Sequence, residues 1–156
     1  LVRALIHATG CEPLIAGKPQ PTLFETTIAE IGTRDVLVIG DRFDTDIDGA
    51  AACGIDSMLV LTGVHGLAEL AAQPFERWPQ FIAQDLRSLT ADVVTVERDG
   101  ESLSTASDHP LATAVVVAAR DRIGQHLERP AYVATEAVAP VVDVRPLLAA
   151  AGSVRP

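Results

Sequence analysis

Positive charge is scarce in this chain of 156 residues, which has 12 lysines and arginines against 21 acidic residues and a net charge of -9. Nucleic-acid binding depends on neutralising phosphates with basic side chains, so this balance argues against a nucleic-acid partner. An anionic membrane surface is disfavoured for the same reason. The sequence therefore predicts neither nucleic acid nor a membrane as a partner.

Long apolar runs and targeting signals are also missing. The longest apolar stretch, residues 111–119, has about half the length that a bilayer crossing needs, and no basic segment precedes an apolar one at the N-terminus. With 48% apolar residues, the chain can still bury a substantial core. We expect a folded cytoplasmic protein.

Cysteine is rare as well, with Cys11 and Cys53 as the only two. Neither belongs to a CxxC pair or to a cysteine–histidine spacing, so the sequence indicates neither a zinc site nor a disulfide framework. His65, His109 and His126 stand in separate sequence contexts without triad spacing, and we interpret them as structural.

Short apolar runs indicate the fold class. Residues 36–39 form a continuous apolar run rich in β-branched side chains, the pattern of a parallel strand buried on both faces. A helix is expected over residues 45–53, ended by Gly54, and a second buried strand over residues 57–61. Strand, helix and strand in this order form a βαβ unit, so we expect an α/β fold with three layers and a parallel sheet.

Helical spacing of apolar residues from Pro21 predicts a helix that ends before Gly32, and residues 67–73 and 79–86 read as a helix and a short strand. Residues 1–10 also have a helix-like pattern.

The character of the sequence changes near residue 91, where we place a domain boundary. A hairpin is expected around Asp99 and Gly100. An amphipathic helix is expected over residues 109–128, whereas residues 130–156 contain four prolines and no clear periodicity.

Four carboxylates, Asp41, Asp44, Asp46 and Asp48, follow the first expected strand within a few residues. In open α/β sheets, ligands bind at the carboxyl ends of the strands. Clustered carboxylates repel one another unless a cation with oxygen ligands neutralises them, and Mg²⁺ is the natural candidate. We assign Asp41 as the metal ligand, because an acid directly after the last glycine of a strand has no helix to cap.

A simpler interpretation stays open for the other acids. Thr45 or Asp44 would cap the helix, and Asp46 and Asp48 in its first turn would complement the helix dipole without any metal.

Lys18 is the only lysine of the chain and lies in a Gly-Lys-Pro loop that enters a helix. Its compact ammonium suits a point-charge contact with phosphate or carboxylate. A single lysine in a loop is ordinarily just solvated, so spacing alone leaves its role open.

Three segments together carry a resemblance: GKPQPTLFE from residue 17, VLVIGDRFDTDI from residue 36, and LVLTGV from residue 59. They are similar to motifs III and IV of the haloacid dehalogenase-like (HAD) superfamily, in particular to its IIA branch of p-nitrophenyl, phosphoglycolate and pyridoxal phosphatases. The resemblance covers roughly residues 1–90. It implies a Rossmann-like sheet that forms part of a HAD core, followed by a C-terminal extension.

The resemblance also implies roles for three residues. Lys18 would be the catalytic lysine that steadies an aspartyl-phosphate intermediate, Asp41 the Mg²⁺ ligand, and Asp46 a second catalytic acid that supports the metal waters and the lysine. The implied activity is a magnesium-dependent phosphatase acting on a small phosphorylated metabolite, in which one aspartate attacks phosphorus and another protonates the leaving oxygen.

The chain departs from the family pattern because motifs I and II, which hold the nucleophile, have no counterpart in it. Residues 46–49 imitate the nucleophile motif DxDG but fall inside a helix start, so we interpret them as a chance similarity. The expected organisation is the end of a cap domain in residues 1–16, the C-terminal half of the core in residues 17–91, and an appended α+β tail in residues 92–156. We interpret the chain, which starts at Leu1, as a fragment that is inactive alone.

The alternative is a non-catalytic α/β module with a regulatory or interaction tail, and magnesium dependence of stability would separate the two. The substrate is not indicated, because the cap sets it. A homo-oligomer stays open.

Overall fold

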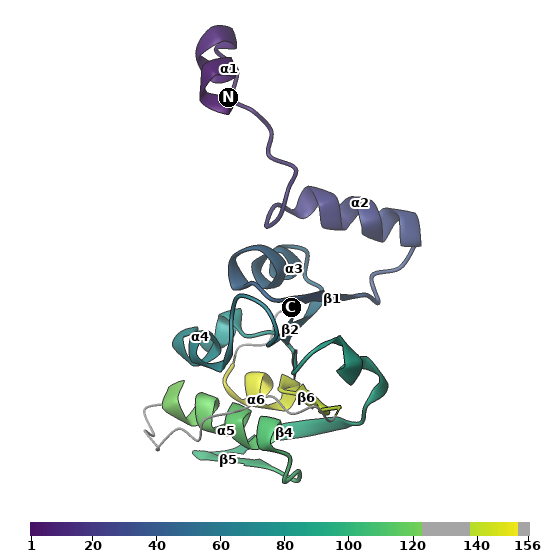
Figure 1. Ribbon diagram of the computed structural model, residues 1–156, viewed down its shortest axis with the longest axis vertical. Coiled ribbons are helices and arrows are strands. Elements are labelled where there is room, and N and C mark those ends of the chain that lie inside the picture. The colour runs from purple at the N-terminus through teal and green to yellow at the C-terminus, as the bar shows by residue number, and fades with distance from the viewer. Residues whose placement is uncertain (123–137, 153–156) are drawn as a thin grey trace.

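The computed structural model describes residues 1–122 and 138–152 (Figure 1). Within them, six strands form one sheet in the order β1-β2-β3-β6-β4-β5. The strands are β1 (Leu37–Gly40), β2 (Asp56–Val60), β3 (Phe81–Ala83), β4 (Val93–Asp99), β5 (Ser102–Thr105) and β6 (Val141–Asp143).

Helices and helical turns connect these strands. The α-helices are α1 (Val2–Thr9), α2 (Pro21–Ile31), α3 (Asp48–Ala52), α4 (Leu67–Ala72), α5 (Pro110–Arg122) and α6 (Arg145–Ala150). A π-helical turn, η1 (Phe43–Ile47), precedes α3, and two 3-10 turns are η2 (Phe75–Arg77) and η3 (Leu86–Thr90). Gly32 and Gly54 both adopt left-handed backbone conformations where the sequence predicts helix ends.

The α/β fold class is confirmed, and the parallel arrangement holds for the first three strands. β1 pairs with β2 and β2 with β3 in parallel, and η1 with α3 forms the crossover between the first two. Beyond β3 the sheet is mixed, because β6 runs antiparallel to β3 and parallel to β4, and β5 closes a hairpin on β4.

The expectation that residues 36–39 are buried on both faces is wrong. β1 lies at an edge of the sheet, where β2 is its only strand partner among the described residues. Leu37 is accordingly 40% exposed, and the rest of the strand is only partly buried. α2 and α3 cover one face, where Ile28 and Ala50 form a small buried cluster with Val38 packed against it.

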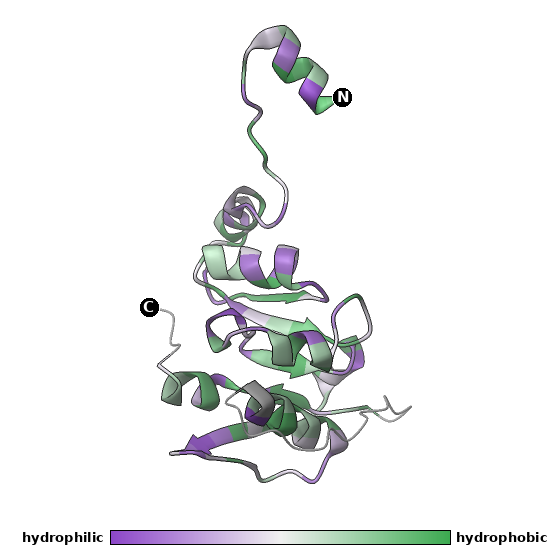
Figure 2. Cartoon of the chain, turned by 90° about the vertical axis from the view of Figure 1, so that its left-hand side faces the viewer, coloured by the Kyte–Doolittle hydropathy of each residue, from purple (hydrophilic) through white to green (hydrophobic). Residues whose placement is uncertain are grey.

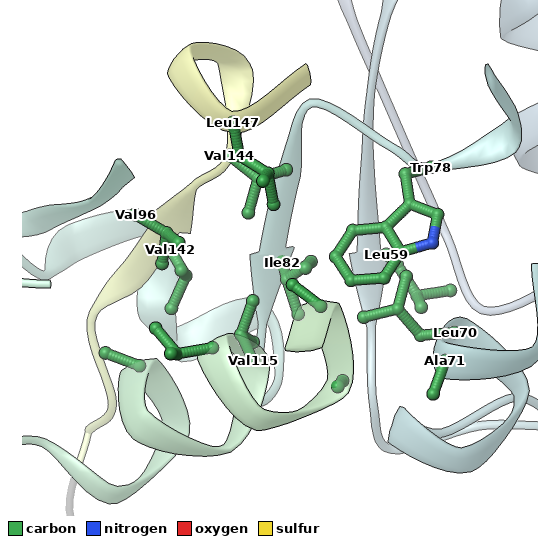
Figure 3. Close-up of a cluster of buried hydrophobic side chains, with 14 of the residues drawn as sticks. Leu59, Leu70, Ala71, Trp78, Ile82, Val96, Val115, Val142, Val144 and Leu147 are labelled. Carbon is green, nitrogen blue, oxygen red and sulfur yellow. The ribbon is translucent and has the colours of Figure 1, made fainter. Parts of the chain in front are cut away.

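The main core lies under α4, α5 and α6. Figure 3 shows Trp78 beside Leu59 at one side of this cluster and Val142 at the other, with Ile82 and Val115 between them. These side chains come from β2, β3, α5, β6 and the segment after η2, so the core spans both halves of the sequence.

The helix expected over residues 109–128 is confirmed for α5, and residues 123–128 lie outside the described part. α5 is amphipathic as expected, because Leu111, Val115 and Ala118 are buried on one side of the helix whereas Thr113 is exposed on the other. The buried side of α5 packs against α4 and strands β4, β5 and β6.

The sheet continues across the boundary expected near residue 91. β6 lies between β3 and β4, with Val142 paired to Ile82 on one side and to Val94 on the other. The hairpin expected around Asp99 and Gly100 is confirmed by β4 and β5, with Gly100 at a φ of 59°. β6 and α6 fall in the stretch without visible periodicity, and the division into a core and a tail stays a prediction.

α1 stands apart from the layered body and is joined to α2 by an extended linker (Figure 1). The linker carries the exposed apolar side chains of Leu14 and Ile15. Figure 2 shows a green, hydrophobic stretch in this linker. In the described part of the chain, every helix is too short or too polar to cross a bilayer.

Candidate functional site

The candidate site forms where β1 and β2 end side by side. The two strands are parallel and in register, with Gly40 opposite Leu59, so the loops that follow them leave the sheet at the same edge. Asp41 comes directly after Gly40, and the loop after β2 brings Gly63 to it. A Cβ atom on Gly63 would overlap the Asp41 carboxylate, so only glycine allows this approach.

Asp41 is held by backbone groups of the second loop. The N–H of Val64 donates a 2.8 Å hydrogen bond to Oδ2 of Asp41, and the N–H of His65 donates a 3.1 Å bond to its backbone oxygen. Within the described residues, Oδ1 of Asp41 has no hydrogen-bond partner. The side chain is partly exposed, so this oxygen is available to a ligand.

The turn after Asp41 starts two residues earlier than the helix expected from residue 45. The N–H groups of Asp46 and Ile47 both donate to the backbone oxygen of Arg42, at 3.1 and 3.2 Å, which widens the first turn into η1. π-helical turns of this kind are frequent at functional sites. The turn directs Phe43 and Asp46 inward and leaves Asp44 in solvent.

Asp46 lies beneath the end of β1 and is only 4% exposed. Its Oδ1 accepts a 2.5 Å hydrogen bond from the Lys18 ammonium, and its Oδ2 accepts a 3.2 Å bond from the N–H of Arg42. A Cβ atom on Gly40 would overlap the Asp46 side chain. The glycine at the end of the strand is therefore a condition for seating this carboxylate.

Lys18 reaches the site from the loop that precedes α2. Its side chain is 45% exposed, and the described residues offer its ammonium no hydrogen-bond acceptor besides Asp46. An ammonium has three N–H donors, so two remain for an anionic ligand. The structure thus pairs Lys18 with Asp46 and places Asp41 at the neighbouring strand end.

The acids Asp44 and Asp48 belong to ion pairs. Asp44 accepts from Arg42 at 3.0 and 2.7 Å, and this hydrogen bonding lowers the pKa of the exposed Asp44 carboxyl. Asp48 accepts from Arg77 at 3.1 and 2.6 Å, which ties α3 to η2. Among the described residues, no side-chain hydrogen bond caps η1 or α3, so the capping interpretation is wrong for Asp44 and Thr45.

Sequence reasoning missed the residues of the second loop and Arg77. His65, for which the sequence indicates only a structural role, accepts with its Nδ1 a 2.9 Å hydrogen bond from the N–H of Phe43. These contacts join residues more than 20 positions apart, and no local spacing signals them.

A magnesium ion fits this site only in part. Across residues 1–122 and 138–152, no three His, Cys, Asp or Glu side chains are arranged to hold a metal. Mg²⁺ is usually bound by one or two carboxylates together with waters and substrate phosphates, so the free oxygen of Asp41 suits it. The remaining ligands would come from outside the described residues.

Comparison with known proteins places this site in a family. A family model described as HAD-hydrolase-like matches residues 15–89. Over 93 residues the chain is 48% identical to the D-glycerol 3-phosphate phosphatase of Mycobacterium tuberculosis. The aligned residues make up 59% of this chain and 26% of that protein. Over 96 residues it is 36% identical to chronophin of Homo sapiens, covering 58% of this chain and 32% of that protein.

A solved structure extends the similarity. The crystal structure of a glycerol phosphate phosphatase from Mycobacterium tuberculosis in complex with magnesium matches with a TM-score of 0.57 at 30% identity. The match covers 98% of this chain and 48% of that one, so it includes strands beyond residue 91. The chain spans about half, or less, of the length of each of these three proteins. Residues 15–89, which hold Lys18, Asp41 and Asp46, are therefore similar to the HAD-like hydrolases.

Proposed function

We propose that this chain supplies the metal-binding and charge-stabilising half of the active site of a magnesium-dependent phosphatase acting on small phosphate monoesters. The observation that carries the proposal is the contact of Lys18 with the buried Asp46. Asp41 lies beside this pair at the end of β1, and its Oδ1 has no hydrogen-bond partner among the described residues. The relatives named above are phosphatases, and one matching structure contains magnesium.

Each of the three side chains has a separate task in this proposal. Asp41 would bind Mg²⁺ through Oδ1, since Oδ2 is held by the N–H of Val64. A bound Mg²⁺ would offset negative charge on the transferring phosphoryl group. Lys18 would place its remaining N–H donors on the phosphoryl oxygens, and Asp46 would orient the ammonium.

The reaction itself would run through an aspartyl-phosphate intermediate. The attacking aspartate and the aspartate that protonates the leaving oxygen would come from residues other than those of this chain, because Asp46 is occupied by Lys18 and by the N–H of Arg42. The 156 residues alone are therefore expected to hydrolyse no p-nitrophenyl phosphate. Turnover by the chain alone that disappears in Asp46→Asn would identify residues 46–49 as a nucleophile motif instead.

The test is Asp41→Asn in a longer protein that joins this chain to an upstream half carrying motifs I and II. Turnover of p-nitrophenyl phosphate with excess magnesium is expected to fall by several orders of magnitude, while the circular dichroism spectrum stays unchanged. Asp35→Asn is the matched control, because Asp35 is an exposed acid near the opposite end of the same strand. Full activity in Asp41→Asn would remove Asp41 as the metal ligand.

Binding of magnesium to the chain separates this function from that of a non-catalytic module. In a thermal unfolding experiment, Mg²⁺ is expected to raise the melting temperature of the wild-type chain and not that of Asp41→Asn. Equal melting temperatures with and without the ion would favour the module.

A further inference from the structure

We propose that His65 is a positioning residue, whose Nδ1 holds the N–H of Phe43 and thereby fixes the turn that carries Asp41 and Asp46. The proposal rests on the function proposed above, because the turn that His65 fixes follows the proposed metal ligand Asp41 and carries Asp46.

The N–H of Phe43 needs a partner from outside its own turn. Phe43 is the first residue of η1, and the first N–H groups of a helical turn find no acceptor within it. The whole residue is only 2% exposed, so few water molecules can reach its N–H group. Nδ1 of His65 lies 2.9 Å from the nitrogen of Phe43 and accepts this hydrogen bond.

The geometry defines which ring nitrogen of His65 carries the proton. An acceptor nitrogen must be unprotonated, so the neutral ring carries its hydrogen on Nε2. The ring also packs on Phe43, with 5.4 Å between the centroids and 32° between the planes, which restricts its rotation. His65 therefore presents Nδ1 from a fixed position.

Three hydrogen bonds join the loop after β2 to the turn after β1, and one of them depends on the identity of residue 65. Val64 and His65 donate their backbone N–H groups to Asp41, which any residue other than proline could do. The bond from Phe43 to the imidazole is made by a side chain. Replacing His65 therefore releases one end of the turn and leaves the two direct contacts to Asp41 available.

Two substitutions test the position of the acceptor. His65→Asn places its amide oxygen close to the position of Nδ1, whereas His65→Gln places it close to that of Nε2, too far along the side chain to reach Phe43. The proposal predicts that His65→Asn restores the wild-type properties and that His65→Gln does not. His109 provides the matched control, since its Nδ1 accepts a 3.1 Å hydrogen bond from the N–H of Leu111 at the start of α5.

The measurements are amide hydrogen exchange of Phe43 by NMR and Mg²⁺ affinity by titration calorimetry on the 156-residue chain. In His65→Gln we expect Phe43 to exchange at least about 10-fold faster and Mg²⁺ to bind about 10-fold more weakly, the range found when partners of metal ligands are removed. His65→Asn should stay within about 3-fold of wild type in both, and His109→Gln should change neither.

The outcomes separate this proposal from the proposed function. Unchanged exchange of Phe43 in His65→Gln overturns the positioning role, as does unchanged Mg²⁺ affinity despite faster exchange. If the wild-type chain binds no Mg²⁺, the proposed metal site of this chain fails. In that case His65 is judged by the carboxyl ¹³C shifts of Asp41 and Asp46, which must change in His65→Gln and recover in His65→Asn.

Discussion

Lys18 and Asp46 are 28 positions apart in the sequence, yet the ammonium of one donates a 2.5 Å hydrogen bond to the carboxylate of the other. Asp46 is buried whereas Lys18 is half exposed, so the pair joins the surface to the interior. It also ties the loop before α2 to the end of β1. The pair therefore has a structural role as well as the catalytic one proposed for it.

Removal of Lys18 is expected to destabilise the fold and to slow turnover. Lys18→Ala leaves the buried Asp46 with one acceptor unpaired, which should lower the free energy of unfolding by about 1.5–3 kcal/mol. In the longer phosphatase, turnover should fall roughly 100-fold to 1000-fold or more. Urea unfolding and steady-state kinetics measure the two effects.

A double-mutant cycle isolates the pair. Adding Asp46→Asn to Lys18→Ala should cost less than it does in the wild type, because the partner charge is already gone. Strictly additive costs would show that the two residues do not interact. In the steady-state kinetics of Lys18→Ala, a change confined to the Michaelis constant would assign Lys18 to substrate binding alone.

Gly40 is expected to tolerate no side chain. In Gly40→Ala the new Cβ overlaps the Asp46 side chain, which must move away from Lys18. We expect a loss of about 1–3 kcal/mol in the free energy of unfolding, as found for overpacked sites. Gly17→Ala is the control, because a Cβ there meets no atom within 4 Å, and it should change stability by less than about 0.5 kcal/mol. Equal stabilities of the two variants would contradict the geometry.

Asp85 is expected to make stability depend on pH in the acid range. Hydrogen bonds from Arg87, the largest cause, lower the pKa of the Asp85 carboxyl from 3.8 to about 2. Since the folded pKa is depressed, the contribution of Asp85 is present above pH 3.8 and is lost as the pH falls towards 2. NMR titration of the carboxyl measures the value directly.

Arg87→Met provides the comparison for Asp85. Without the guanidinium the pKa of Asp85 should move back towards 3.8. Asp85→Asn should remove this part of the pH dependence of unfolding. An Asp85 pKa that is the same in Arg87→Met and in the wild type would rule out Arg87 as the cause.

Val142 tests whether the sheet folds as one unit across residue 91. Val142 is fully buried in β6 between β3 and β4, so Val142→Ala should cost about 2 kcal/mol. Trp78, the only tryptophan and also fully buried, reports by its fluorescence the unfolding of the part before residue 91. In Val142→Ala we expect the unfolding transition followed by Trp78 fluorescence to shift to milder conditions together with the transition followed by circular dichroism. A Trp78 transition that stays in place would support two independent domains.

Local patterns were sufficient to predict the βαβ unit and the strand-end position of Asp41. The apolar run before Gly40 and the glycine at residue 54 act over a few residues, and their structural effects are the ones expected from the sequence. The mixed order of the sheet could not be predicted, because the insertion of β6 between β3 and β4 depends on contacts over more than 40 residues.

The same distinction holds within the site. The contact between Lys18 and Asp46 is one that the family motifs suggest, whereas the catalytic roles of the two residues stay a prediction. The partners of Asp48 and Phe43 are set by tertiary packing: Arg77 comes from a 3-10 turn and His65 from the loop after β2. The partners of the buried side of α5 could not be predicted either, because they come from α4 and from strands that precede and follow the helix.

The half-exposed ammonium of Lys18 makes the site chemically addressable. Since the chain has one lysine, an amine-selective reagent has one side-chain target, and that target is the group bonded to Asp46. Acetylation or a fluorescent label would remove the charge there and nowhere else on a side chain. The rate of labelling would then report how firmly Asp46 holds the ammonium, and a bound phosphate analogue should slow it.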